Sequence, residues 1–223
     1  MTRPARHDLV WLDPARLDAL ALDPAHRGEV ARWLAAGWPL VATRRPPGLA
    51  AQVACLGLPL PPSRGRTRIA LRAPADAVVG VEKALRLVEA LPSAPPDRRG
   101  ALAALHDQAR RLGLTLRVHG SLAWQHLTGQ PYLTEGSDLD LLLTVTDRAQ
   151  LTAALGLLQR WERRTGLTAD AEIGLPAGGV AWREVWSGAA RLLVKGEDFV
   201  ALRPRAELLA PLDAEGAGAK GAA

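Results

Sequence analysis

The spacing of apolar residues separates helical stretches from strand-like ones in the C-terminal half of the chain. Residues 97–112 and 148–164 carry apolar side chains at helical spacing, which predicts two amphipathic helices. Residues 116–119 and 139–145 are short apolar runs, typical of buried strands, and a further strand is predicted over 167–173. These elements form the larger of two predicted domains.

The N-terminal part has shorter elements. Apolar runs over 40–43, 52–58 and 67–71 are broken by proline and glycine, and one helix is predicted after Asp23. This pattern predicts a small α+β module with a short sheet. The proline-rich stretch at 92–96 is the best candidate for a linker. The predicted parts are a small N-terminal domain, a linker, a larger domain and a disordered tail, over residues 1–91, 92–96, 97–212 and 213–223.

The composition indicates a soluble globular protein. Hydrophobic residues make up 48% of the chain and charged residues 23%, which is ordinary for this class. No apolar run approaches the roughly 18 residues of a membrane span, and the first residues lack the apolar stretch of a signal peptide. The single cysteine, Cys55, excludes an internal disulfide and a thiolate metal cluster. We therefore expect a cytoplasmic protein without a membrane partner.

The net charge is +5, and nearly all of the basic residues are arginine. Arginine binds phosphate and carboxylate through its planar guanidinium group, so the charge suits an anionic substrate or an acidic partner. A GC-rich coding sequence would also replace lysine by arginine throughout, which makes the charge alone a weak indication. Because lysine is rare, Lys83 and Lys195 stand out.

Three arginines alternate with other residues where the chain enters the predicted strand at 67–71. Alternation along a strand would place Arg64, Arg66 and Arg68 on one face. That face could be a docking surface for phosphates or acidic helices, or a charged strand edge that prevents aggregation. The sequence does not separate these two interpretations.

Gly120 and Ser121 interrupt the apolar run at 116–119 and lead directly into a predicted helix over 121–127. Glycine allows the backbone to approach a ligand closely, and the N–H groups at the start of a helix suit an anion such as phosphate. A single Gly-Ser at such a turn is common, so its meaning depends on the next strand of the chain.

Asp138 and Asp140 lie at the start of that strand, predicted over 139–145. Side chains alternate along a strand, so both carboxylates point to the same side. Two acids on one face of an apolar strand repel each other and lose hydration, unless a divalent cation lies between them. A Gly-Ser turn followed by this pair indicates a phosphoryl or nucleotidyl transferase.

A later pair of acids, Asp170 and Glu172, alternates with small apolar residues and also shares one face. If their strand lies next to that of Asp138 and Asp140, one of them can complete a three-carboxylate metal site. Glu172 is slightly favoured because of its apolar neighbours, but the sequence does not separate it from Asp170. The alternative is that both acids lie on a hydrated sheet edge.

Two further segments could contact a substrate. Lys195 ends the apolar strand at 191–196, where it could extend to water or hold a phosphate near a metal cluster. Trp182 and Trp186 lie one helical turn apart, on either side of Arg183. Core packing is the default for such a tryptophan pair, and stacking on an adenine is the alternative.

These segments resemble a known family. Gly-Ser, Asp-x-Asp and a later acidic strand together are similar to the nucleotidyltransferase superfold shared by DNA polymerase beta. The closer resemblance is to the malonate decarboxylase holo-acyl-carrier-protein synthase family, also called phosphoribosyl-dephospho-CoA transferase. It implies an α+β fold in which a polymerase-beta-like mixed-sheet domain follows a smaller N-terminal domain. The segments that carry it are 7–12, 57–61, 120–125, 127–129, 132–133, 137–142 and 181–184.

The resemblance implies a transfer reaction without a nucleic-acid partner. The family moves the phosphoribosyl-dephospho-CoA group from triphosphoribosyl-dephospho-CoA to a serine of the apo acyl carrier protein subunit of malonate decarboxylase, releasing pyrophosphate. It implies that Asp138, Asp140 and one of Asp170 and Glu172 are catalytic and bind Mg²⁺. Binding of phosphate, substrate or carrier protein is then expected of Gly120, Ser121, Lys195, Trp182, Arg183, Arg64, Arg66 and Arg68.

Several alternatives stay open at this point. An enzyme of the same fold could serve the carrier subunit of citrate lyase, or adenylylate a small molecule, an RNA end or a protein. A non-catalytic module that binds a carrier protein or CoA is a different class. The retention of Asp138, Asp140 and Glu172 argues against such a module, because a degenerate member would be expected to lose these costly acids first.

Overall fold

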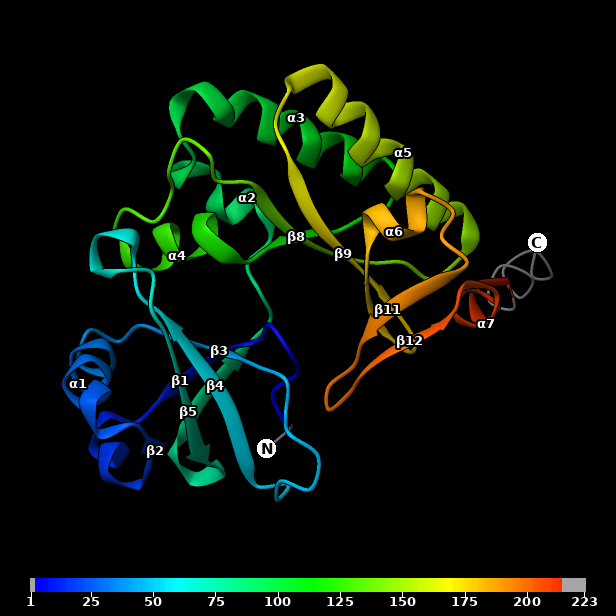
Figure 1. The fold of residues 1–223 in the computed structure, drawn as a ribbon. Helices are drawn as coiled ribbons and strands as arrows, with labels where there is room; N and C mark the ends of the chain where they lie inside the picture. The colour runs from blue at the N-terminus through cyan, green and yellow to red at the C-terminus, as the bar shows by residue number, and fades with distance from the viewer. Residues whose placement is uncertain (1–2, 214–223) are drawn as a thin grey trace. The chain divides into compact units, whose positions relative to one another are not determined.

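The structure, a computed structural model, describes residues 3–213 and divides the chain into two compact units (Figure 1). The first unit contains the chain up to Ala84, together with Leu127–Tyr132 and Glu197–Phe199. The second contains Leu85–His126, Leu133–Gly196 and, among the described residues, 200–213. Each unit combines a sheet with helices, so the α+β prediction is confirmed.

The first unit is built on an antiparallel sheet. Within the described residues, six strands form it in the order β2-β5-β4-β3-β1-β6. Its elements are β1 (Leu9–Leu12), η1 (Pro14–Ala19), β2 (Ala21–Leu22), η2 (Pro24–His26), α1 (Arg27–Ala35), β3 (Leu40–Ala42), β4 (Val53–Pro59), η3 (Pro62–Arg64), β5 (Arg68–Pro74), η4 (Ala75–Ala77) and β6 (Val78–Glu82), where η marks a 3-10 helix.

Strand β5 begins later than the sequence indicates. Its first residue is Arg68, whereas Arg64 ends η3 and forms an ion pair with Glu29 of α1. Gly65 has φ +79° and Arg66 has φ +54°, so the backbone between the arginines is not extended. The prediction that the three arginines share one strand face is therefore wrong.

The second unit contains a mixed sheet. Within the described residues, its six strands follow the order β12-β11-β10-β9-β8-β7, with β8 and β9 parallel and the other neighbours antiparallel. Its elements are α2 (Leu87–Ala90), η5 (Leu91–Ser93), α3 (Pro96–Arg111), β7 (Leu116–Val118), α4 (Gly120–Thr128), β8 (Leu139–Thr144), α5 (Arg148–Thr165), β9 (Ala169–Leu175), β10 (Gly178–Ala181), α6 (Trp182–Trp186), β11 (Arg191–Lys195), β12 (Val200–Pro204) and α7 (Arg205–Leu209). None of the helices formed by residues 3–213 is long and apolar enough to cross a membrane.

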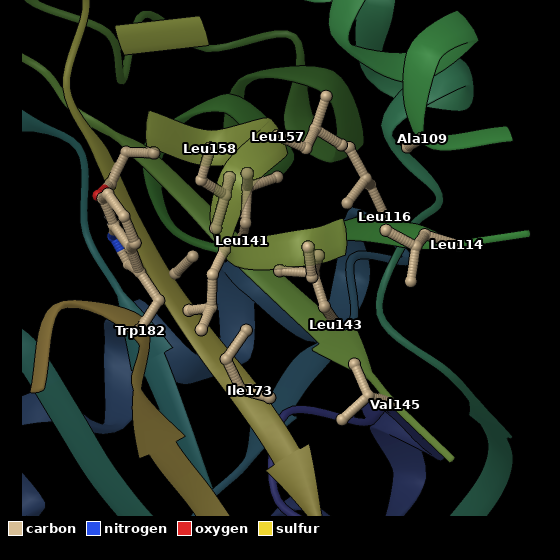
Figure 2. Packing of buried hydrophobic residues seen from close by; sticks show 14 of the residues in the cluster. Ala109, Leu114, Leu116, Leu141, Leu143, Val145, Leu157, Leu158, Ile173 and Trp182 are labelled. Carbon is tan, nitrogen blue, oxygen red and sulfur yellow. Dashed lines mark hydrogen bonds between the residues drawn. The ribbon is translucent and has the colours of Figure 1, made fainter. Parts of the chain in front are cut away.

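The core of the second unit fixes the direction of its strand side chains. Helices α3 and α5 run side by side, and their apolar faces join one buried cluster with the sheet (Figure 1). Leu141 of β8 and Ile173 of β9 point into this cluster near Leu157 of α5 (Figure 2). Each such side chain stabilises the fold by about 1.5–3 kcal/mol when buried. Because side chains alternate, Asp140 and Asp170 lie on the opposite face of the sheet.

The boundary between the units differs from the expected linker. Residues 92–96 lie within the second unit, where they complete η5 and begin α3 at Pro96. Proline is favoured at the start of a helix because its missing N–H would have no partner there.

In the predicted tail, Asp213 accepts hydrogen bonds from Arg148, and residues 214–223 lie outside the described part of the chain.

Candidate active site

The turn between β7 and α4 brings the backbone against a carboxylate. His119 N–H donates to Asp140 O at 3.2 Å, and the chain then turns at Gly120, which has φ +62°. A Cβ atom on Gly120 would lie 1.8 Å from Asp140 Oδ2. Glycine is therefore required at this position both by its left-handed backbone and by the approach of the carboxylate. Ser121 follows in the first turn of α4.

Three aspartates meet on the face of the sheet opposite the core. Asp140 and Asp170 are direct partners in the parallel pairing of β8 with β9, and Asp138 precedes Asp140 by two residues. One carboxylate oxygen from each of the three lies within 4.8 Å of the others. Asp138 and Asp170 are exposed, and Asp140 is half-buried.

The donor set and spacing of these aspartates fit a hard divalent cation. Carboxylate oxygens are the ligands that Mg²⁺ prefers, and two oxygens on one Mg²⁺ lie up to about 4.2 Å apart. A separation within 4.8 Å therefore needs only small side-chain adjustments. Without a cation, three carboxylates at this distance would repel one another.

Glu172 belongs to a different arrangement on the same face. It is not part of the group formed by Asp138, Asp140 and Asp170, and its carboxylate lies 3.6 Å from Lys195 Nζ. A Cβ atom on Gly179, between them on β10, would lie 1.9 Å from Glu172 Oε1. The geometry therefore favours Asp170 over Glu172 as the third metal ligand, and places Glu172 with the phosphate-binding candidate Lys195.

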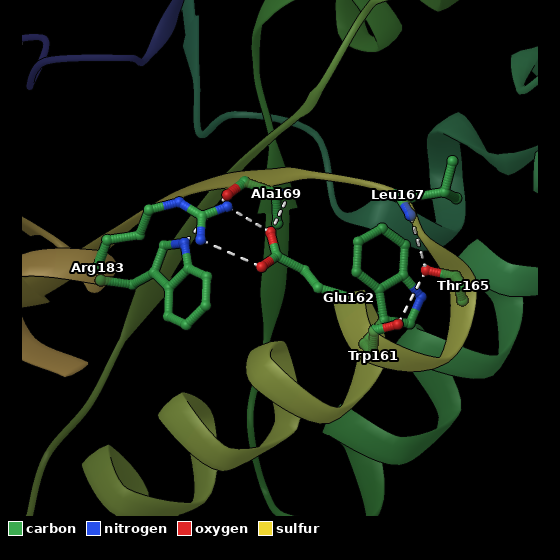
Figure 3. A network of polar contacts seen from close by, with 7 residues as sticks. Trp161, Glu162, Thr165, Leu167, Ala169 and Arg183 are labelled. Atoms are coloured by element: carbon green, nitrogen blue, oxygen red, sulfur yellow. Dashed lines mark hydrogen bonds and ion pairs between the residues drawn. The ribbon is translucent and has the colours of Figure 1, made fainter. Parts of the chain in front are cut away.

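Trp182 and Arg183 do not join the carboxylates. Trp182 is 2% exposed within the apolar cluster and donates its indole N–H to Ala169 O at 3.0 Å. Arg183 donates to both carboxylate oxygens of Glu162, at 2.6 and 3.2 Å (Figure 3). Both side chains thus bind protein groups. Trp186 is 51% exposed and does not pack in the core with Trp182, so the prediction of a buried tryptophan pair is wrong for Trp186. The arrangement gives no support to adenine stacking on Trp182.

The arginines proposed for docking belong to the first unit. Arg66 and Arg68 are exposed, and Arg64 contacts Glu29. The aspartates belong to the second unit. A role of the arginines in binding a phosphate or the carrier protein therefore stays a prediction.

Arg98 holds the loop before Asp138, a role that the sequence does not reveal. From α3 it donates to Ser137 O at 2.9 Å and also to Glu135 O, and so fixes the loop that leads into Asp138. Asp138 also borders a small, partly open pocket whose walls include Leu122 and Trp161. No spacing signal connects an arginine at a helix start with a strand some 40 residues later in the sequence.

Comparisons with known proteins identify the same family over most of the chain. The family models for the N-terminal and C-terminal domains of phosphoribosyl-dephospho-CoA transferase MdcG match residues 5–84 and 84–206. A phosphoribosyl-dephospho-CoA transferase of Xanthomonas campestris pv. campestris is 43% identical over 204 residues, which are 91% of this chain and 95% of that protein. The protein of the same name from Bradyrhizobium diazoefficiens is 39% identical over 211 residues, 92% of this chain and 92% of that protein.

A more distant relative from Pseudomonas aeruginosa carries the same name and is 35% identical over 171 residues, 74% of this chain and 77% of that protein. No solved structure gives a significant match. The two family models meet at residue 84, where the structure also divides the chain. The chain therefore belongs to the phosphoribosyl-dephospho-CoA transferase family and is an enzyme of the transferase class.

Proposed function

We propose that this enzyme transfers the phosphoribosyl-dephospho-CoA group from triphosphoribosyl-dephospho-CoA to a serine of the apo acyl carrier protein subunit of malonate decarboxylase, releasing pyrophosphate. The family membership supports the transferred group. The grouping of Asp138, Asp140 and Asp170 against Gly120 carries the mechanistic part of the proposal. It combines a candidate cation site with a close backbone approach, which transfer from a triphosphate requires.

The same features support assignment of the second unit to the nucleotidyltransferase superfold. Its order of elements is a strand ending at Val118, a Gly-Ser turn, helix α4 and then the Asp-x-Asp strand β8. The neighbouring parallel strand β9 supplies the third acid. This order of elements and the mixed sheet are the basis of the assignment.

In the proposed mechanism, Asp138, Asp140 and Asp170 would hold Mg²⁺. The bound ion supplies positive charge for the triphosphate oxygens and the departing pyrophosphate. The N–H groups at Gly120 and Ser121 would bind the outer phosphates at the start of α4, which is nine residues long.

The reaction itself exchanges one phosphorus–oxygen bond for another. The serine oxygen of the carrier protein attacks the phosphorus next to the ribose, and the bond from that phosphorus to pyrophosphate breaks. The hydroxyl proton needs an acceptor on the carboxylate face, for which Asp170 and Glu172 are the candidates. Lys195, 3.6 Å from Glu172, would pair with a phosphate oxygen.

Mass spectrometry tests this proposal directly. The chain is incubated with triphosphoribosyl-dephospho-CoA, Mg²⁺ and the apo carrier subunits of malonate decarboxylase and citrate lyase in separate reactions. We expect the malonate decarboxylase subunit to gain the mass of the prosthetic group. A parallel reaction with labelled ATP is the control. Labelling from ATP alone would contradict the proposed donor, and faster modification of the citrate lyase subunit would contradict the proposed acceptor.

A further inference from the structure

Ala169 is the first residue of β9 and lies beyond the end of the neighbouring strand β10. Thr168 O accepts from Leu139 N–H at 2.9 Å, so the backbone groups of Thr168 face β8. Because these groups alternate in direction along a strand, those of Ala169 face the other neighbour, β10. Strand β10 ends at Ala181, whose partner on β9 is Glu172, and it therefore stops short of Ala169.

Side chains take the place of the missing strand. Glu162 Oε1 accepts from Ala169 N–H at 2.7 Å, and Trp182 Nε1–H donates to Ala169 O at 3.0 Å. Figure 3 shows Glu162 between Ala169 and the guanidinium group of Arg183. That guanidinium group also lies 4.7 Å from the centroid of the Trp182 ring. We call Glu162, Trp182 and Arg183 the Ala169 clamp.

The ion pair within the clamp contributes little to stability by itself. The side chain of Arg183 is 53% exposed, and a charge this accessible is strongly screened by water, so that ion pairs of exposed arginines are typically worth about 0–1 kcal/mol. The hydrogen bonds to Ala169 have a more specific effect. They satisfy both polar groups of a backbone unit that is otherwise unpaired on this side, and they fix its position.

The residue that follows this unit is Asp170. Within residues 3–213, the Asp170 carboxylate makes no hydrogen bond or ion pair with the protein, so its position depends on the backbone that carries it. Its partner Asp140 lies directly opposite on β8. A shift of the backbone at Ala169 would therefore change the separation of the two carboxylates.

We propose that Glu162, Trp182 and Arg183 are positioning residues of the aspartate site. They act through the backbone of Ala169 to hold Asp170 at the distance from Asp138 and Asp140 that a divalent cation requires. This inference rests on the proposed function, because it needs the aspartates to bind a cation. Groups that hold metal ligands from outside the coordination shell typically change metal affinity about 10–100-fold when they are removed.

The inference is tested by the affinity for Mn²⁺, measured by electron paramagnetic resonance on the full chain below its unfolding temperature. Trp182→Phe removes the N–H donor and keeps an aromatic ring, whereas Glu162→Ala removes the acceptor of Ala169 N–H. We expect each to raise the Kd for Mn²⁺ about 10-fold. Transfer activity should recover at saturating Mg²⁺, because the ligands themselves remain.

Glu207→Ala is the matched control, since Glu207 of α7 forms an exposed ion pair with Arg203 of β12 and neither residue belongs to the Ala169 clamp. Its Kd for Mn²⁺ should equal that of the unaltered chain. Unchanged Mn²⁺ affinity in folded Trp182→Phe and Glu162→Ala would overturn the inference, as would an equal change in Glu207→Ala. If Trp182→Phe does not fold, Glu162→Ala decides the outcome. Failure of the unaltered chain to bind Mn²⁺ would instead contradict the cation site and the inference together.

Discussion

The carboxylate of Asp140 lies directly against the backbone of Gly120, so close that any side chain at residue 120 would overlap with it. This contact joins the two motifs of the site, since Gly120 opens α4 and Asp140 lies on β8. A phosphate at the start of α4 would therefore lie beside the carboxylates.

Gly120→Ala should strongly impair transfer. The new methyl group would displace the Asp140 carboxylate, and a misplacement of about 1 Å in an active site can reduce the rate about 100-fold. We expect kcat/KM to fall at least about 100-fold, as measured by mass spectrometry of the carrier protein.

Gly113→Ala is the control, because Gly113 has a similar φ of +68° and nothing within 4 Å of the added Cβ. It should lower the free energy of unfolding by about 1 kcal/mol and keep its activity. Equal activity in the two variants would contradict the contact.

Arg98→Ala should weaken the proposed metal site by releasing the loop before Asp138. The variant loses the hydrogen bonds to Ser137 O and Glu135 O. We expect the Mg²⁺ concentration for half-maximal transfer to rise about 10-fold. Arg99→Ala tests the specificity, since Arg99 donates to Pro92 O and Ala94 O at 3.1 and 3.0 Å instead. The same Mg²⁺ dependence in both variants would rule out a local role for Arg98.

Lys195→Met should impair donor binding. Lys195 supplies a positive charge on the carboxylate face, next to Glu172, and charge-assisted contacts with phosphate are typically worth about 1.5–3 kcal/mol. We expect the KM for triphosphoribosyl-dephospho-CoA to rise about 10-fold or more, while the free energy of unfolding changes little. Steady-state kinetics at fixed carrier protein concentration measures this. A normal donor KM would remove Lys195 from the phosphate site.

Tyr132→Phe should destabilise the first unit, to which Tyr132 belongs. The buried phenol donates to Pro59 O at 2.7 Å, and loss of this hydrogen bond should lower the free energy of unfolding in urea by about 0.5–1.5 kcal/mol at pH 8.

Burial raises the pKa of Tyr132 above its usual value. The stabilising effect is therefore present below about pH 10, where the unfolded phenol is neutral, and declines as the pH rises further. The difference between the two proteins should shrink at pH 11, and a constant difference would contradict this account.

The sequence identifies Asp138 and Asp140 because a two-residue spacing on one strand determines their common face. It cannot separate Asp170 from Glu172, since that choice depends on which residue of β9 lies opposite Asp140. The register of two strands separated by a long helix is a tertiary property. The structure sets Asp170 there and turns Glu172 toward Lys195.

The errors in the sequence-based predictions have local causes. Gly65 and Arg66 adopt positive φ values, so the alternation of arginines does not belong to a strand. The prolines at 92–96 indicate a break in structure, yet they can equally begin a helix, as Pro96 does. The contacts of Arg98 and Glu162 with backbone groups join segments far apart in the sequence, and no periodic pattern encodes such contacts.

Isothermal titration with Mg²⁺ tests the central claim most directly, namely that Asp138, Asp140 and Asp170 form the cation site. The unaltered chain is compared with Asp170→Asn and Glu172→Gln, two conservative changes on neighbouring positions of one strand face. We predict that Asp170→Asn loses measurable binding, whereas Glu172→Gln keeps the affinity of the unaltered chain within about threefold. Loss of binding in Glu172→Gln with retention in Asp170→Asn would contradict the account.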